Sequence, residues 1–222
     1  MNQSGIPYVY YDLDISMIDL RYGSLEDKRV NKETIHIIEN FKKNFSEISE
    51  KNIGLFIKGS NGNGKTLCAC DIGKNISLQK KNNHERYKVF FTTFSGLISI
   101  IWGGLSYDPL FQKIYNNDEQ RKALFKYWNE SDLRIIDDVG KENKTKSGNE
   151  ASVLDEFIRS NAYTERKSII ITSNIETNDI AKNYNKSVDS LLNEKILHIE
   201  IIGEDYRKNK YLEQTKQRLL KD

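Results

Sequence analysis

Cysteine is nearly absent from this chain, with only Cys68 and Cys70 among 222 residues. They lie two positions apart in a stretch with helical spacing, so their side chains point to different faces of a helix. This geometry excludes a disulfide between them and disfavours a shared metal ion. We expect both to be small packing residues of a protein that works in a reducing compartment.

Proline and long apolar runs are also scarce. The two prolines are Pro7 and Pro109, so neither interrupts a core element. The longest apolar stretch, Leu97–Leu105, is too short to cross a bilayer. The first residues, Met1–Ser16, lack the basic and then apolar layout of a signal peptide. The sequence therefore predicts a cytoplasmic protein with no membrane partner.

A strong net charge is missing as well. The 34 Lys and Arg residues nearly balance the 32 Asp and Glu residues, which leaves a formal charge of +2. No global basic field attracts nucleic acid, so any such contact must come from local patches. A chain with 37% hydrophobic and 30% charged residues is polar but able to fold. Its length predicts one domain of α/β size.

A glycine-rich octet is the most informative motif that is present. Gly59-Ser60-Asn61-Gly62-Asn63-Gly64-Lys65-Thr66 matches the phosphate-binding pattern GxxxxGK[S/T] between a strand-like and a helix-like run. The glycines let the main chain curl so that its N–H groups point at an anion, and the helix adds its positive end. The structural alternative is a plain glycine-rich turn. The flanking elements favour ATP binding by the whole octet and the adjoining Leu67, with Lys65 on the β- and γ-phosphates and Thr66 on Mg²⁺.

Buried strands alternate with helices along the chain. The predicted helices are Thr66–Gln79, Pro109–Trp128 and Ala151–Ala162, together with a basic helix from Gly203 onward. The predicted strands are Ile53–Lys58, Lys88–Thr92, Leu133–Asp137, Ser168–Ser173 and Leu197–Ile201. This alternation predicts an α/β fold of three layers, with a five-stranded parallel sheet covered on both faces.

The third predicted strand ends in two acids, in the run Leu133-Arg134-Ile135-Ile136-Asp137-Asp138. Ligands of open α/β sheets bind at the carboxyl ends of the strands, so these acids are expected beside the phosphate loop. One carboxylate is needed for the Mg²⁺ shell and another to orient and deprotonate the attacking water. Asp137 is predicted for the first role and Asp138 for the second. The alternative is a pair of acids that cap a turn.

A polar residue also ends the fourth predicted strand. Asn174 follows Ile169-Ile170-Ile171-Thr172-Ser173 and is predicted to sense the γ-phosphate or the attacking water, helped by Thr172. The alternative is an asparagine that only turns the strand into a loop. The predicted catalytic set is thus Lys65, Asp138 and Asn174.

These motifs, in this order, resemble those of the AAA+ ATPases, which are P-loop NTPases. Four runs are similar to the DnaC/DnaI-type replicative helicase loaders and to the related IstB-type transposition ATPases: Gly5-Ile6-Pro7-Tyr8, Ile135–Gly140, Thr172-Ser173-Asn174 and Ile202–Arg207. The resemblance implies an ATP- and Mg²⁺-dependent protein that binds single-stranded DNA. Such a protein places a replicative helicase on DNA, or guides a transposase.

The resemblance also implies a division of the chain. Residues 1–50 would form a linker and helix, 51–202 the AAA+ core, and 203–222 a reduced C-terminal lid with a sensor-2-like helix. Arg207 in that helix would contact the nucleotide, unless it is an ordinary surface arginine. Tyr8, Tyr10 and Tyr11 fall where the family often packs the adenine ring, and the sequence leaves open which of them would do so.

Two departures from the family bear on activity. The family usually supplies an arginine finger shortly before the fifth strand, but no arginine occurs between Asn174 and Arg207. Lys186 and Lys195 lie there, but lysine lacks the planar fork of arginine. Only about fifty residues precede the first strand, too few for a separate helicase-binding domain. The missing arginine predicts ATP hydrolysis that is weak or depends on a partner.

Three functions remain open at this point. The chain could be a helicase loader, an IstB-like transposition ATPase, or an ATP-binding adaptor with negligible hydrolysis. Whether it forms a homo-oligomer is also open. Local basic groups and the aromatic residues Phe94, Trp102 and Tyr107 are candidates for DNA contact, although a solvated surface with core aromatics explains them equally well. The basic groups are Lys80 and Lys81; Arg121, Lys122 and Lys126; Lys141, Lys144 and Lys146; and Arg207, Lys208 and Lys210.

Overall fold

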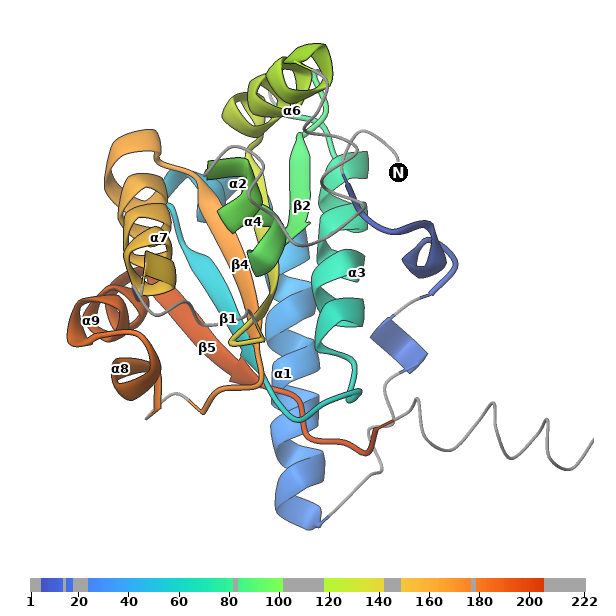
Figure 1. Ribbon diagram of the computed structural model, residues 1–222. Helices are drawn as coiled ribbons and strands as arrows, with labels where there is room; N and C mark the ends of the chain where they lie inside the picture. Colours follow the sequence, from blue (N-terminus) through green and yellow to red (C-terminus); the bar gives the residue numbers. More distant parts are fainter. Residues whose placement is uncertain are drawn as a thin grey trace, which may run out of the picture.

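The structure is a computed structural model that describes residues 5–13, 15–17, 24–81, 84–101, 118–141, 149–176 and 179–205. Several residues singled out in the sequence lie outside these ranges: Trp102, Tyr107, Lys144, Lys146, Arg207, Lys208 and Lys210. The described part of the chain forms one sheet with helices on both of its faces (Figure 1).

A five-stranded parallel sheet forms the centre of the molecule. Its strands are β1 (Gly54–Lys58), β2 (Val89–Thr93), β3 (Leu133–Val139), β4 (Ser168–Ser173) and β5 (Ile196–Glu200), in the order β2-β3-β4-β1-β5. The predicted strands are confirmed, with ends that coincide or differ by one or two residues. The strand before the phosphate loop lies between β4 and β5, so the carboxyl ends of three strands surround that loop.

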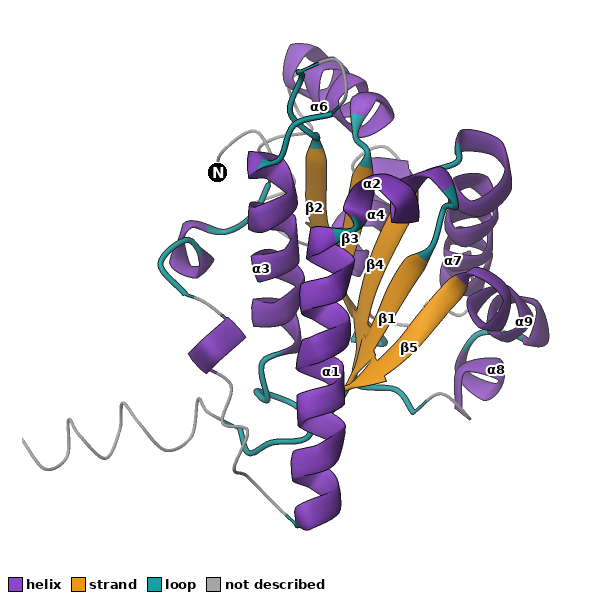
Figure 2. Ribbon diagram, turned by 180° about the vertical axis from the view of Figure 1, so that it is seen from behind, coloured by secondary structure: helices purple, strands orange, loops and turns teal. Residues whose placement is uncertain are grey.

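One helical layer is made by α1 (Leu25–Lys43), α2 (Phe45–Glu50) and α3 (Lys65–Leu78) (Figure 2). Ser24 begins α1 with a capping box, since its side chain accepts from Asp27 N–H and the Asp27 carboxylate accepts from Ser24 N–H. Ile38 and Phe41 from α1 pack with Ile72 from α3 against the inner residues of β1. Cys68 and Cys70 are fully buried in this layer, and burial raises the pKa of both thiols, as expected of packing residues.

The other face of the sheet is covered by α4 (Phe94–Ile101), α7 (Asn149–Arg159) and α9 (Lys186–Lys195), with the short α8 (Ile180–Asn183) beside α9. Leu154 and Phe157 from α7 and Leu192 from α9 bury against Phe56 and Ile171 of the sheet. The Thr93 hydroxyl accepts from Gly96 N–H at 3.0 Å, so Thr93 caps α4.

Two helices differ in extent from their predicted bounds. The helix expected over Pro109–Trp128 is described as α6, Asp118–Glu130, with Leu124 and Trp128 partly buried. The helix expected over Ala151–Ala162 ends its α-helical part at Arg159 and continues as a π-helical turn, η3 (Ser160–Glu165). Arg166 then stops it with a φ of 55°.

The N-terminal segment and α1 cover edges of the sheet. Two short 3₁₀ turns, η1 (Tyr8–Tyr10) and η2 (Ile15–Met17), pack beside α3. The Thr34 hydroxyl donates to the Glu200 carbonyl at 2.6 Å, and the Asn31 side chain both donates to and accepts from Ile202. These contacts pair main-chain polar groups at the last residue of β5 and just beyond it. Among the described helices, none combines the length and the apolar character needed to cross a membrane.

Candidate functional site

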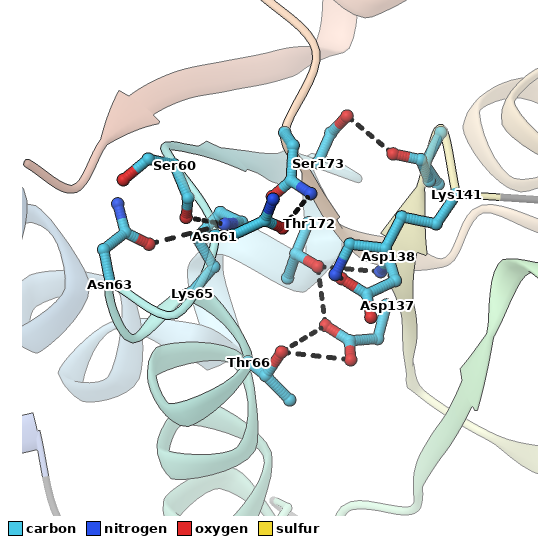
Figure 3. Close-up of polar contacts among 12 residues, drawn as sticks. Ser60, Asn61, Asn63, Lys65, Thr66, Asp137, Asp138, Lys141, Thr172 and Ser173 are labelled. Atoms are coloured by element: carbon cyan, nitrogen blue, oxygen red, sulfur yellow. Dashed lines mark hydrogen bonds and ion pairs between the residues drawn. The ribbon is translucent and has the colours of Figure 1, made fainter. Parts of the chain in front are cut away.

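The octet Gly59–Thr66 joins β1 to α3 as a curled loop at the carboxyl edge of the sheet (Figure 3). Gly62 has a φ of 73° and Gly64 a φ of 107°, values that side-chain-bearing residues rarely adopt. Gly64 is also the residue before the first turn of α3, and its carbonyl accepts from Cys68 N–H at 2.9 Å. The loop therefore meets the positive end of α3, which is the geometry of an anion-binding cradle.

Lys65 spans the interior of this loop. Its side chain is buried, and Nζ donates to the Ser60 carbonyl at 2.5 Å and lies 3.4 Å from Asn63 Oδ1. A buried ammonium needs oxygen partners, and the loop supplies them from within the curl. This placement fits the predicted contact of Lys65 with the β- and γ-phosphates of ATP.

Thr66 and Asp137 come together although 71 positions separate them in the sequence. The Thr66 hydroxyl lies 3.0 and 3.1 Å from the two carboxylate oxygens of Asp137. A hydroxyl and a carboxylate are hard oxygen donors of the kind that Mg²⁺ prefers. Within the described ranges no group of three or more His, Cys, Asp or Glu side chains could hold a metal alone. These two donors thus fit a magnesium ion that completes its shell with water and phosphate oxygens.

Asp137 is held from behind by Thr172. The Thr172 hydroxyl donates to Asp137 Oδ1 at 2.6 Å and accepts from Asp138 N–H at 2.9 Å. Burial raises the pKa of Asp137, while the hydrogen bonds from Thr172 and Thr66 oppose that rise. Sequence reasoning missed this role, because it placed Thr172 next to Asn174 as a helper in sensing. The structure instead has Thr172 fully buried, where it orients both acids.

Asp138 lies one residue further along β3, where the register with β4 shifts before Val139 pairs with Ser173. Its φ of 60° is left-handed, a conformation that is uncommon for a residue with a side chain. Its carboxylate is partly exposed and pairs with Lys141 Nζ at 2.8 Å. The side chain lies beside Asp137, the predicted metal ligand (Figure 3). Strained main chain of this kind gathers at functional sites.

Asn174 reaches across the mouth of the loop. Its Nδ2 donates to Asn61 Oδ1 at 2.7 Å. Its Oδ1 is buried and has no hydrogen-bond partner among the described residues. A buried acceptor without a donor costs free energy unless a ligand or water supplies one. This orphaned oxygen at the edge of the cradle fits the predicted contact with attacking water.

The segment after β5 braces the loop from the other side. Asn63 is completely buried, and its Nδ2 donates to the Ile201 carbonyl. The Ser60 hydroxyl donates to the Gly203 carbonyl at 3.3 Å. A Cβ added at Gly62 would overlap the Asp205 carboxylate. Residues Ile201–Asp205, here called the strap, thus touch the cradle at three points, although Arg207 itself lies outside the described residues.

Leu67, Tyr11 and Phe94 are three further residues that the sequence named as candidates for contact with ATP or DNA. Leu67 is partly buried and packs its side chain against the core on the α3 side. Tyr11 lies beside Lys74, whose Nζ donates to the Tyr11 carbonyl at 3.3 Å, about 13 Å along α3 from Lys65. Phe94 is fully buried, so the expectation that it contacts DNA is wrong. Phe94 is the first residue of α4, directly after β2, and its ring packs in the core on that face of the sheet.

Among the basic groups predicted to meet DNA, several are tied to acids. Lys81 pairs with Asp132 at 2.8 Å and Lys126 lies 3.9 Å from Glu130. At the end of β1, Lys58 pairs with both Glu176 and Glu200, at 2.9 and 3.0 Å. That pairing links the loop after β4 to the end of β5, next to the cradle. It was not foreseen because its members are far apart in sequence.

Comparisons with known proteins show which structures share this arrangement. No protein-family model matches the chain, and no curated protein does either. Its structure is similar to that of the DnaC helicase loader, with a TM-score of 0.60 and 22% identity over 88% of this chain and 99% of that chain. It is also similar to DnaI, with a TM-score of 0.58 and 17% identity over 89% of this chain and 95% of that chain.

The replication initiator DnaA, solved with AMPPCP and single-stranded DNA, matches with a TM-score of 0.55 and 16% identity, over 86% of this chain and 52% of that chain. At these identities the likeness is one of fold. Together with the sheet order and the two helical layers, it confirms the predicted fold class, an α/β P-loop sandwich of the AAA+ type.

Proposed function

We propose that this chain, whose fold is the AAA+ fold of the DnaC and DnaI helicase loaders, binds and hydrolyses ATP with Mg²⁺. The observation that carries the proposal is the meeting of Thr66 and Asp137 beside the buried ammonium of Lys65. Packing alone does not require a carboxylate, a hydroxyl and an ammonium to meet at the carboxyl ends of strands. A triphosphate with its metal ion explains all three.

The roles of the residues follow from their positions. Lys65 and the main-chain N–H groups of the cradle bind the phosphates, while Thr66 and Asp137 hold the metal ion. Mg²⁺, when bound, neutralises charge on the phosphate oxygens. Asp138 orients the attacking water and accepts its proton, and Asn174 Oδ1 accepts a second hydrogen from that water. Thr172 keeps both acids in place.

The partners that fit this proposal are a replicative helicase and single-stranded DNA. Support comes from the fold shared with two helicase loaders and with DnaA, whose solved form holds single-stranded DNA. A cytoplasmic location goes with those partners. A transposase as partner, in the manner of the IstB-type ATPases, is the alternative that the sequence also allows.

An adaptor that binds ATP without turnover is the second candidate. The lack of any arginine between Asn174 and Arg207 favours it, because a missing arginine finger lowers turnover by several orders of magnitude. The orphaned Oδ1 of Asn174 and the placement of Asp138 favour hydrolysis. The two candidates differ in a measurable rate.

Two measurements test the proposal. ATP binding is measured by titration calorimetry for the natural chain, for Lys65→Ala and for Lys43→Ala, an exposed lysine of α1 that serves as control. Binding should disappear only in Lys65→Ala, and tight binding by that variant would refute the site. Steady-state hydrolysis is then measured with and without single-stranded DNA and a candidate helicase. A rate at background in every case leaves the adaptor as the function.

A further inference from the structure

The turn after β3 carries a cation beside the candidate catalytic acid. Lys141 Nζ lies 2.8 Å from Asp138 Oδ1, with side-chain exposures of 39% and 33%. The ammonium also acts on Asp137, whose pKa is raised by burial and lowered in part by Lys141. Lys141 thus lies near both predicted acids, on the side opposite Lys65 (Figure 3). Nothing in the motifs assigns it a role.

The main chain under Lys141 is firmly placed. Asp138 N–H donates to Thr172 Oγ1 at 2.9 Å, and Lys141 N–H donates to the Asp138 carbonyl at 3.3 Å. Gly140 has a φ of 100°, and a Cβ added there would lie 2.5 Å from the Ile175 side chain, in the loop that carries Asn174. The turn therefore packs tightly against the loop that carries Asn174, and these contacts hold its main chain rather than the Lys141 side chain.

The ion pair itself is weak enough to exchange. A partly exposed Lys–Asp pair contributes little to stability, because water screens it and both side chains lose freedom. Lysine is a compact cation on a long flexible stem, so it can change partners without moving its main chain. A terminal phosphate carries more negative charge than one carboxylate and offers three acceptor oxygens. When such a group lies near Asp138, it is the stronger partner.

We propose that Lys141 exchanges Asp138 for the terminal phosphate of ATP, and so makes this site discriminate ATP from ADP. The inference rests on the proposed function, since it needs the phosphates in the cradle. Asp138 loses its ion pair with Lys141 only when a third phosphate is bound. Its carboxylate then acts on the attacking water. The exchange also brings a positive charge from the turn after β3 to the terminal phosphate. An arginine finger usually supplies such a charge, but residues 175–206 contain no arginine.

Titration calorimetry with ATP and with ADP tests this proposal by binding alone. In Lys141→Met, affinity for ATP should fall roughly tenfold, as the loss of one charge-assisted hydrogen bond predicts, while affinity for ADP stays within about twofold. Lys141→Arg keeps the charge and should keep the preference for ATP. Lys51→Met is the matched control, because Lys51 forms an exposed pair with Glu47 far from the cradle.

Each outcome is decisive. Unchanged ATP affinity in Lys141→Met, or equal losses for ATP and ADP, overturns the exchange and leaves Lys141 as a local ion pair. Thermal unfolding of each variant shows whether a loss comes from folding instead. If the natural chain binds neither nucleotide, the proposed function fails first. If it binds both and Lys65→Ala binds neither, the site stands and the Lys141 variants judge this inference alone.

Discussion

The side-chain amide of Asn63 donates to the main-chain carbonyl of Ile201, which ties the middle of the phosphate loop to the residue that follows β5. Ile201 N–H in turn donates to the Lys58 carbonyl at 2.9 Å, at the end of β1. The strap Ile201–Asp205 also meets Asn31 of α1 through Ile202. The cradle, the C-terminal strap and the N-terminal helix therefore form one connected unit.

Gly62→Ala should disturb this unit. The new Cβ would overlap the Asp205 carboxylate, and the residue would have to hold a φ of 73°. We expect ATP affinity to fall roughly tenfold and amide hydrogen exchange in the strap to become faster, because the strap is displaced. Calorimetry and hydrogen exchange read by mass spectrometry measure the two effects.

Gly140→Ala is the control for that variant. It also strains a left-handed glycine, but its Cβ meets Ile175 rather than the strap. Exchange in residues 201–205 should remain as in the natural chain. If both variants speed exchange there equally, the contact between Gly62 and Asp205 does not hold the strap.

Asp137→Asn should make the protein more stable while it removes metal-dependent nucleotide binding. Burial raises the pKa of Asp137, so its ionised form is unfavourable in the fold. A group with a raised pKa contributes its full stability below its unfolded-state value and loses that contribution as the pH rises through the folded-state value. At pH 8, without nucleotide, we expect Tm to rise by about 2–4 °C, and the gain to shrink as the pH falls.

Asp155→Asn provides a control of opposite sign. Partial burial raises the pKa of Asp155, but the hydrogen bonds from Ser187 and Arg159 outweigh it and lower the value overall. Replacing this carboxylate should reduce stability at pH 8. Mg²⁺ with ATP should then raise the Tm of Asp155→Asn and not that of Asp137→Asn. A loss of stability in Asp137→Asn contradicts the account of this buried acid.

The buried pair between Lys42 of α1 and Asp71 of α3 should show an asymmetric cost. The two groups are 2.8 Å apart, with side-chain exposures of 10% and 1%. Lys42→Met leaves the Asp71 carboxylate buried without its cation, which should cost about 3–5 kcal/mol of unfolding free energy. Asp71→Leu should cost less, because Lys42 keeps Glu39 at 2.6 Å.

The double variant completes the test of that pair. Lys42→Met with Asp71→Leu replaces both charges by apolar groups, so it should be more stable than Lys42→Met alone. Urea unfolding measures all three variants and gives the coupling energy. Additive losses would mean that the two side chains do not depend on each other.

Acid should weaken the fold partly through His198. Burial lowers the pKa of this imidazole, which stacks on Phe56 at 5.1 Å between ring centres. A group with a lowered pKa contributes its stability above the unfolded value, about 6.5 for histidine, and loses it as the pH falls further. Urea midpoints between pH 8 and pH 5.5 should therefore fall less in His198→Phe than in the natural chain. His36→Gln, at an exposed position of α1, should behave like the natural chain.

The phosphate loop and all five strands could be predicted from sequence, because each rests on local information. A loop of fixed spacing needs glycines where φ is positive, and Gly62 and Gly64 have such values. Buried strands need continuous apolar residues, and Ser168–Ser173 was predicted with its observed bounds. The rule that ligands gather at carboxyl ends of parallel strands then predicted that Asp137 meets Thr66.

Some roles could not be predicted, because they depend on partners distant in the chain. Arg134 lies within an apolar strand and is fully buried, where Glu165 at 2.5 Å and Asn161 at 2.9 Å satisfy it. Phe94 follows a strand end and could have faced solvent, but α4 turns it into the core. No spacing rule links such residues to their neighbours.

The sequence by itself determined that this chain curls a loop for phosphate and places acids after an apolar strand, since motif spacing and strand burial are properties of short segments. Only the tertiary structure decided that Thr172 holds Asp137 and that the strap contacts Gly62. Those contacts arise where separate strands end side by side. Their distances depend on how the whole sheet packs, and no short segment encodes that.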